Sequence, residues 1–301
     1  MTDSAGLLRA FAVPRRVGTP NHAQVRDVLK RELASRGFTV EEHAFSSRPP
    51  WMLFGTPAVV HGVNLIGRRP TAQPPNRPTL WLSAHYDSKG QPISMAMRIV
   101  GAAAAALGTL GVLGALAAGW TLVLGLALLV AGGGAAILAQ NRVTDRSPGA
   151  VDNASALVAV FAILDMLPRD ASLGVLFLDA EELGLLGARA LVEDRAGLLA
   201  DTAVINFDGL DDRGRPIAFL HRPGPIARAV VSELGALRAR WLPVVVDGIV
   251  LAKGARECVT IMQGDWGTAR VVHTPGDTAA RLTLQGVRAV AEGVARALTS
   301  P

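Results

Sequence analysis

The chain has 301 residues, of which 50% are hydrophobic, with one cysteine and a formal net charge of +5. A single cysteine excludes a disulfide within the chain, and the basic charge comes without a zinc finger, a helix-turn-helix signature or a basic stripe with interleaved aromatics, so nucleic acid is not an expected partner. The apolar excess lies in one charge-free run from Ile99 to Asn141, and the rest is long enough for one domain with a full core.

The first part of the chain reads as a helix followed by strands. The N-terminus lacks the continuous apolar core of a signal peptide. Apolar residues then recur on one helical face between Thr19, a candidate cap, and Gly37, which ends the pattern. Residues 38–45 and 59–67 read as strands, and 76–88 reads as an apolar strand that runs into polar residues.

After the charge-free run, helices alternate with apolar strands. Residues 152–167 have the spacing of a buried helix, and 283–298 have that of an amphipathic helix. Residues 171–178 and 201–208 read as strands that are apolar almost throughout. Such strands, alternating with helices, are typical of a sheet that is covered on both faces. We therefore predict an α/β fold, a three-layer sandwich with a mostly parallel central sheet.

Five polar clusters share one predicted position at the edge of this sheet. Three of them end strands, one opens a helix, and one lies in a loop after a strand. Their sequences are SAHYDS, FLDAEE, INFD, PGAVDNAS and VVHTPGDT. Because sites in open α/β sheets gather at the carboxyl ends of the strands, we expect the five clusters to meet there.

The residue types in these clusters suit a metal site. His85 and Asp87 are two apart at a strand end and share a face, so Asp87 can accept the second ring N–H of a His85 ligand. Asp152, Asp208 and His273 add two carboxylates and another imidazole. Together with a glutamate, this set without cysteine suits a pair of Zn²⁺ ions bridged by a carboxylate, with Mn²⁺ or Co²⁺ as substitutes.

Two adjacent glutamates, Glu181 and Glu182, follow the strand at 171–178. Adjacent residues that leave a strand point in different directions. One glutamate can therefore bind a metal while the other stays free beside it. A free carboxylate in that position is a general base.

In chain order, the motifs H-x-D, Asp-Asn before a helix, Glu-Glu, N-x-D and H-T-x-x-D-T closely resemble those of metallopeptidase family twenty-eight, the co-catalytic di-zinc aminopeptidases. The resemblance extends to residues 16–45 and covers nearly the whole chain outside the charge-free run. Two departures are Val151, where many members have a second Asp, and Ala156, where Gly is common. Neither residue is an implied ligand.

The resemblance implies how five residues would hold two zinc ions. Asp152 would bridge the two ions. His85 and Asp208 would complete one site, and Glu182 and His273 would complete the other.

The same resemblance implies the chemistry. Glu181 would be the general base, and Asp87 would orient His85. In the family mechanism the metals also hold the free amino terminus of the substrate and polarise the scissile carbonyl. The implied function is that of a zinc-dependent aminopeptidase, which hydrolyses N-terminal residues from peptides.

Several residues outside these motifs have simpler expected roles. Met262 and Trp266 either line a specificity pocket or pack in the core, and Cys258 is expected to be a small buried residue on a strand. The remaining histidines are expected to be structural or surface residues: His22, His43, His61 and His221.

Two alternative functions stay open. The first is a non-catalytic membrane receptor or assembly protein on the same fold, although such relatives usually lose ligands and none is lost here. The second is a zinc acyltransferase that resembles glutaminyl cyclases, which use a similar scaffold with one zinc. Retention of both His85 and Asp208 beside the glutamate pair favours two metals and hydrolysis.

The charge-free run interrupts the peptidase-like sequence. About 20 apolar residues span a bilayer as a helix, and the run is long enough for two, near 99–118 and 121–139. Gly119 and Trp120 would form the turn, and the many small residues suit close helix packing in lipid. A re-entrant hairpin and a soluble buried hairpin are the alternatives.

These features predict an integral membrane protein with one peptidase domain in two parts. The first part would be 1–94, the transmembrane hairpin 95–141, and the second part 142–301. Because His85 and Asp152 should bind the same metal, both ends of the hairpin must return to the active site, which places that site near the bilayer.

The flanks of the hairpin predict its orientation. They carry Lys89, Arg98, Arg142 and Arg146, whereas the turn carries no charge. The positive-inside rule then places the catalytic domain on the cytoplasmic face.

Overall fold

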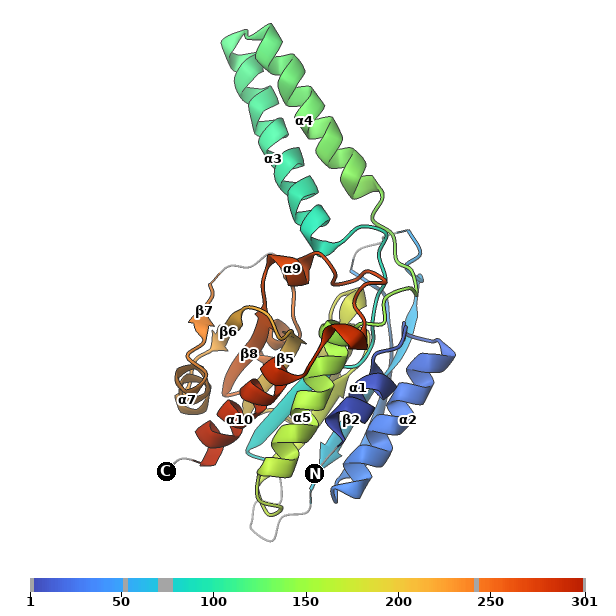
Figure 1. Ribbon diagram of the computed structural model, residues 1–301, viewed down its shortest axis with the longest axis vertical. Helices are drawn as coiled ribbons and strands as arrows, with labels where there is room; N and C mark the ends of the chain where they lie inside the picture. The colour runs from blue at the N-terminus through green and yellow to red at the C-terminus, as the bar shows by residue number, and fades with distance from the viewer. Residues whose placement is uncertain (1–2, 51–53, 70–77, 241–243, 300–301) are drawn as a thin grey trace.

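The computed structural model describes residues 3–50, 54–69, 78–240 and 244–299. Within these residues, one eight-stranded sheet has the strand order β1-β2-β4-β3-β5-β8-β6-β7 (Figure 1). Its four middle strands are parallel. They are β4 (Leu173–Leu178), β3 (Leu80–His85), β5 (Ala203–Leu210) and β8 (Glu257–Gly264).

The flanking strands complete the sheet with antiparallel pairs. β1 (Thr39–Ser47) pairs with β2 (Val60–Arg68), and β2 pairs with β4. On the other side, β6 (Arg215–Arg222) runs antiparallel to β8 and parallel to the short β7 (Leu237–Arg238). The sheet is therefore parallel at its centre and antiparallel towards its edges.

Helices cover both faces of the sheet, which confirms the predicted three-layer α/β fold. The larger apolar core joins the sheet to α1 (Ser4–Phe11), α2 (Pro20–Ser35), α5 (Ser155–Met166), α7 (Pro225–Glu233) and α10 (Gln285–Thr299). A second core on the opposite face joins it to α6 (Leu186–Asp194) and α8 (Gly248–Leu251).

The predicted strands lie close to the observed ones. The apolar strand expected within 76–88 begins at Leu80, and residues 76 and 77 lie outside the described part of the chain. The strand expected at 201–208 continues to Leu210 through a register shift after Phe207.

Two apolar helices project from the domain as an antiparallel pair (Figure 1). They are α3 (Met95–Ala118) and α4 (Thr121–Ala139). α3 begins before residue 99, where the sequence placed its start, because the Ser94 hydroxyl caps it by accepting the Met97 N–H at 3.3 Å. Gly119, with φ of 71°, ends it in the left-handed conformation that glycine adopts without strain.

Small residues bring the two helices into close contact. A Cβ atom on Gly108 would lie 2.4 Å from the Ala131 nitrogen, and one on Gly134 would lie 2.4 Å from the Ala105 nitrogen. These two glycines therefore set the approach of the backbones, as in helix pairs that associate in lipid.

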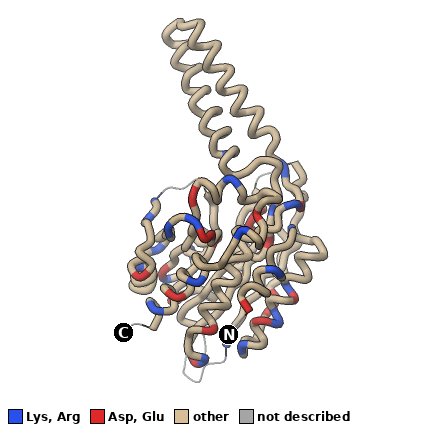
Figure 2. Tube along the Cα trace, viewed as in Figure 1, with Lys and Arg blue, Asp and Glu red and all other residues tan. Residues whose placement is uncertain are grey.

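The outer surface of the pair is apolar and exposed. Both helices are long and apolar enough to cross a membrane, with mean hydropathies of 2.0 and 2.4 over windows that are only 17% and 11% buried. Figure 2 shows lysine and arginine at the base of the hairpin and no charged residue farther out.

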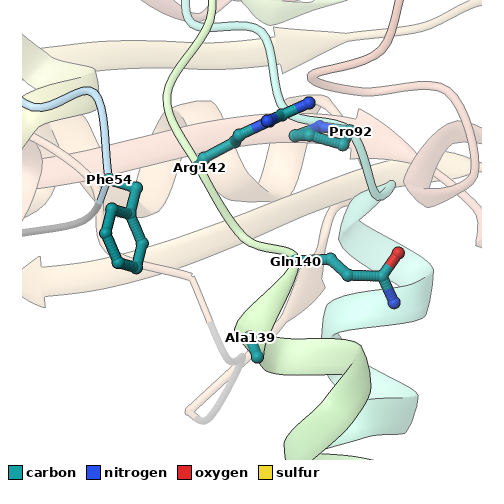
Figure 3. A pocket seen from close by; sticks show the side chains of 5 residues that line it. All are labelled: Phe54, Pro92, Ala139, Gln140 and Arg142. Atoms are coloured by element: carbon teal, nitrogen blue, oxygen red, sulfur yellow. The ribbon is translucent and has the colours of Figure 1, made fainter.

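A narrow neck joins the hairpin to the domain. Gly90 and Thr144 exchange two backbone hydrogen bonds, at 2.9 and 2.8 Å, and the Val143 N–H donates to the Phe54 carbonyl at 2.7 Å. Beside the neck lies a hollow of about 400 Å³, shown in Figure 3. It is lined by Phe54, Pro92, Ala139, Gln140 and Arg142.

Candidate metal centre

All five predicted ligands lie at the carboxyl edge of the parallel strands. His85 is the last residue of β3, and Asp208 lies near the end of β5. Asp152 lies in the turn that precedes α5, and Glu182 lies in the turn after β4. His273 follows the short helix α9 (Trp266–Ala269), which comes after β8. The topology therefore brings together side chains that are far apart in the sequence.

The five side chains form two groups that share Asp152. One group contains His85, Asp152 and Asp208, and the other contains Asp152, Glu182 and His273. In each group the candidate ligand atoms lie within 4.8 Å of one another, and every member is buried. The two groups contain the same residues as the two zinc sites that the family resemblance implies, and their role as ligands stays a prediction.

Asp152 lies between the two imidazoles. Its Oδ1 atom is 3.1 Å from His85 Nε2, and its Oδ2 atom is 3.0 Å from His273 Nε2. Each oxygen of one carboxylate thus faces a different group. This is the arrangement that a bridging ligand requires.

Asp208 and Glu182 lie beside the same two imidazoles. Asp208 Oδ1 is 3.8 Å from His85 Nε2, and Glu182 Oε2 is 3.0 Å from His273 Nε2. His85 Nε2, Asp152 Oδ1 and Glu182 Oε1 are buried without a hydrogen-bond partner among the described residues. Buried polar atoms are normally paired, so these atoms are candidates for binding a metal ion. The imidazole nitrogens and carboxylate oxygens of the five side chains are ligand atoms that suit zinc.

The pKa values of the two adjacent glutamates, Glu181 and Glu182, are shifted in opposite directions. Burial raises the pKa of Glu181 well above its ordinary value, and the carboxylate of Asp208 adds to this effect. Burial also raises the pKa of Glu182, but the charges of His273 and Lys89 outweigh it and lower that pKa to about 2. Glu181 therefore holds a proton readily, whereas Glu182 stays ionised. Such divergent pKa values are typical of neighbouring carboxylates that have different roles.

Asp87 contacts more than the imidazole that it was predicted to orient. Its Oδ1 atom is 3.4 Å from His85 Nδ1. The same carboxylate accepts the backbone N–H of Glu181 at 3.1 Å and that of Glu182 at 3.3 Å. Asp87 therefore also holds the turn that presents both glutamates.

Two cations contact the second group. Lys89 Nζ lies 3.0 Å from Glu182 Oε2, and the other oxygen of that carboxylate has no hydrogen-bond partner in the described part of the chain. Arg98, on α3, donates from Nη2 to His273 Nδ1 at 2.5 Å. An imidazole that binds metal through Nε2 keeps its proton on Nδ1, so we expect Arg98 to shift when this group holds an ion. The sequence placed Lys89 and Arg98 only in the hairpin flanks.

Asp247 is a buried residue that the motifs did not indicate. Both of its carboxylate oxygens lack a hydrogen-bond partner within the described residues. Burial raises its pKa to about 8, and it interacts electrostatically with His85 and Asp208. It therefore adds a carboxyl group near the first ligand group.

Asp179, the first carboxylate of the FLDAEE cluster, has a structural position. It pairs with His22 Nε2 at 2.8 Å and accepts the Val63 N–H at 2.8 Å. The Tyr86 hydroxyl also donates to it, at 3.0 Å. Asp179 thus fixes β2 beside β4 and lies outside both ligand groups.

The other histidines contact structural partners. His43 Nε2 is 3.1 Å from Asp194, and His221 lies 2.9 Å from the Thr260 hydroxyl. The exposed His61 lies 2.7 Å from Ser46. Like His22, they stand outside the candidate centre, as the sequence predicted.

Asp277, in the H-T-x-x-D-T motif, holds the loop that carries the shared ligand. It accepts the Val151 N–H at 2.7 Å and the Asp152 N–H at 3.2 Å. Burial raises its pKa to about 6. The sequence motif contains Asp277 but does not indicate this supporting role.

Asp277→Asn should weaken metal binding. One of the two backbone N–H groups would face an amide NH₂ and lose its acceptor, so the Asp152 loop would be less well held. Loss of such a supporting group typically costs about 10–100-fold in metal affinity. Competition with a chromophoric chelator measures this affinity. The exposed Asp170→Asn is the control, and equal zinc affinity in the two variants would contradict the assigned role.

The fold and the two groups of side chains define an α/β protein with a candidate metal centre at the carboxyl edge of its sheet. The chain belongs to peptidase family M28, whose family model matches residues 137–298. A comparison with curated protein sequences gave no significant match.

Solved structures share the fold at low sequence identity. An aminopeptidase from Aneurinibacillus sp. strain AM-1 is 11% identical, with a TM-score of 0.65 over 98% of this chain and 92% of that one. The zinc aminopeptidase BSAP from Bacillus subtilis is 12% identical, with a TM-score of 0.63 over 98% and 93%. Glutaminyl cyclase from Porphyromonas gingivalis is 18% identical, with a TM-score of 0.66 over 98% and 96%.

Proposed function

We propose that this chain is a zinc aminopeptidase anchored in a membrane by its α3–α4 hairpin. The observation that carries the proposal is the position of Asp152, whose two oxygens face the imidazoles of His85 and His273 at 3.1 and 3.0 Å. Membership of peptidase family M28 supports a peptide substrate.

Five residues would hold two zinc ions. Asp152 would bridge them, His85 and Asp208 would complete one site, and Glu182 and His273 would complete the other. When bound, the ions supply Lewis-acid polarisation of the scissile carbonyl and lower the pKa of water.

The protein's own groups would manage the proton and the geometry. The raised pKa of Glu181 suits it to take a proton from the attacking water and to pass it to the leaving amine. Asp87 would keep that carboxylate in place through the backbone of the turn. Burial of these side chains reduces solvent screening and so strengthens the electrostatic interactions between them.

A direct assay tests this function. Purified full-length protein, supplied with Zn²⁺, should release N-terminal residues from aminoacyl chromogenic amides and short peptides. A chelator should abolish the release, and added zinc should restore it. Peptides with an acetylated N-terminus are the matched control and should resist cleavage. Cleavage of acetylated peptides at the same rate would contradict an aminopeptidase.

A zinc acyltransferase that acts as a glutaminyl cyclase is the second candidate, because the P. gingivalis cyclase shares the fold. Such an enzyme would cyclise N-terminal glutamine and release ammonia. The presence of both His85 and Asp208 in the first ligand group favours a second metal and hydrolysis.

We propose that the peptidase domain comprises 1–94 and 142–301 and that the hairpin between them crosses the bilayer. The residues Lys89, Arg98 and Arg142 lie at its base, so both parts of the domain would face the cytoplasm.

A topology experiment checks this orientation. A fluorescent protein that matures only in the cytoplasm should be bright when fused to the C-terminus. A phosphatase that is active only outside the cytoplasm should be inactive at the same position. The reverse pattern would place the catalytic domain on the other side.

A further inference from the structure

The base of the hairpin lines the cavity that contains the candidate metal centre. This cavity has a volume of about 860 Å³ and reaches Asp152, Glu182 and the other carboxylates of the centre. On α3, the residues Met95, Ile99 and Ala102 line the cavity. These positions are four and three residues apart, so they form one stripe along the helix.

The facing wall belongs to the peptidase domain and is also apolar. Met262 on β8, Trp266 on α9 and Val272 lie along it. Trp266 is 50% exposed, which leaves much of its ring available for contact. α3 packs directly on α9, and Leu138 from the last turn of α4 extends the apolar lining. The cavity is thus mainly apolar along its walls, with Asp265 as a charged lining residue outside the centre, and it is charged where it meets the centre.

The neck fixes the position of the hairpin base relative to the candidate metal centre. The Gln91 N–H donates to the His273 carbonyl at 2.7 Å, so the chain just before α3 is tied to the backbone of a residue of the centre. Arg98, the only charged residue of α3, lies in the first turn of the helix, beside the centre.

Helix lengths place this wall at the surface of a bilayer. At about 1.5 Å per residue, the 24 residues of α3 extend about 36 Å and the 19 of α4 about 28 Å. The hydrocarbon core is about 30 Å thick, so the first turn of α3 would stand at headgroup level. The charge-free run begins at Ile99, directly after Arg98. Ile99 and Ala102 would then lie where the headgroups meet the hydrocarbon.

We infer that the base of the hairpin is a substrate-binding wall, which accepts peptides with large apolar side chains at their first positions, presented at the membrane surface. This inference rests on the proposed peptidase function. It gives the hairpin a part in specificity in addition to its role as an anchor. An apolar side chain between Ala102 and Trp266 would be removed from water on both sides, and such burial favours binding.

A matched pair of variants tests the wall. Ala102→Phe fills the cavity side of α3, whereas Ala103→Phe places the same side chain on an exposed position that does not line the cavity. The substrates are two peptides of equal length that begin with two leucines or two serines. Full-length, zinc-loaded wild type should prefer the leucine peptide about tenfold. Ala102→Phe should lower kcat/KM for that peptide about tenfold, mainly through KM, and Ala103→Phe should change it less than twofold.

Photo-crosslinking supplies a readout that does not need turnover. A photoreactive side chain replaces Ala102 or, as the control, Ala103, each in a Glu181→Gln background. A labelled leucine peptide should crosslink at position 102 and not at 103, and excess unlabelled leucine peptide should suppress the product. Equal crosslinking at both positions, or none at 102, would overturn the inference. Failure of wild type to cleave any peptide would instead refute the proposed function, and crosslinking would still decide whether the wall binds peptide.

Discussion

Glu181→Gln should abolish peptide hydrolysis while the metal content stays that of the wild type. The amide has nearly the shape of the carboxylate but cannot take a proton, and loss of a general base costs about 10²–10⁴-fold in rate. Glu181 belongs to neither ligand group, so the ligands remain intact. The measurements are kcat on an aminoacyl amide and zinc content by elemental analysis.

The exposed Glu193→Gln serves as the control for the same chemical change and should match the wild type. Near-normal turnover in Glu181→Gln would refute its role as the base. Loss of zinc from that variant would mean that Glu181 is the ligand and that the roles of Glu181 and Glu182 are reversed.

Asp152→Ala should have the larger effect on metal content, because Asp152 is the residue common to both ligand groups. Removing it takes one oxygen from each group and leaves His85 and His273 without the carboxylate between them. We expect well under two zinc ions per chain and no hydrolysis above background.

Elemental analysis after gel filtration measures this loss, with the exposed Asp170→Ala as the control. Circular dichroism and the unfolding midpoint establish that the variant is folded. A folded Asp152→Ala protein that keeps both ions would contradict the bridging position.

The centre of the fold and the ligand cluster were predictable because their signals are local. β3, β4 and β5 are almost entirely buried, so their sequences are apolar almost throughout, and polar residues stand at or just after their ends. A shared position at strand ends then brings His85 and Asp208 together without further information. The two long helices were predictable because the run from Ile99 to Asn141 is apolar and carries no charge.

Other features were not predictable, either because the sequence patterns that indicate them are weak or because they depend on contacts between residues far apart in the sequence. β6 has mixed polarity and is only partly buried, and α7 and α8 are too short for a clear periodicity. Asp277 supports backbone N–H groups 125 and 126 positions away, and Arg98 meets His273 across 175 positions. Only the folded chain shows such contacts.

One peptide tests the central claim most directly. Zinc-loaded protein is incubated with a peptide that begins with glutamine and has a free N-terminus, and the products are weighed by mass spectrometry. The two-metal aminopeptidase account predicts free glutamine and a peptide shortened by one residue, with both products absent in Glu181→Gln. A full-length product that has lost only ammonia would identify a cyclase and contradict the account.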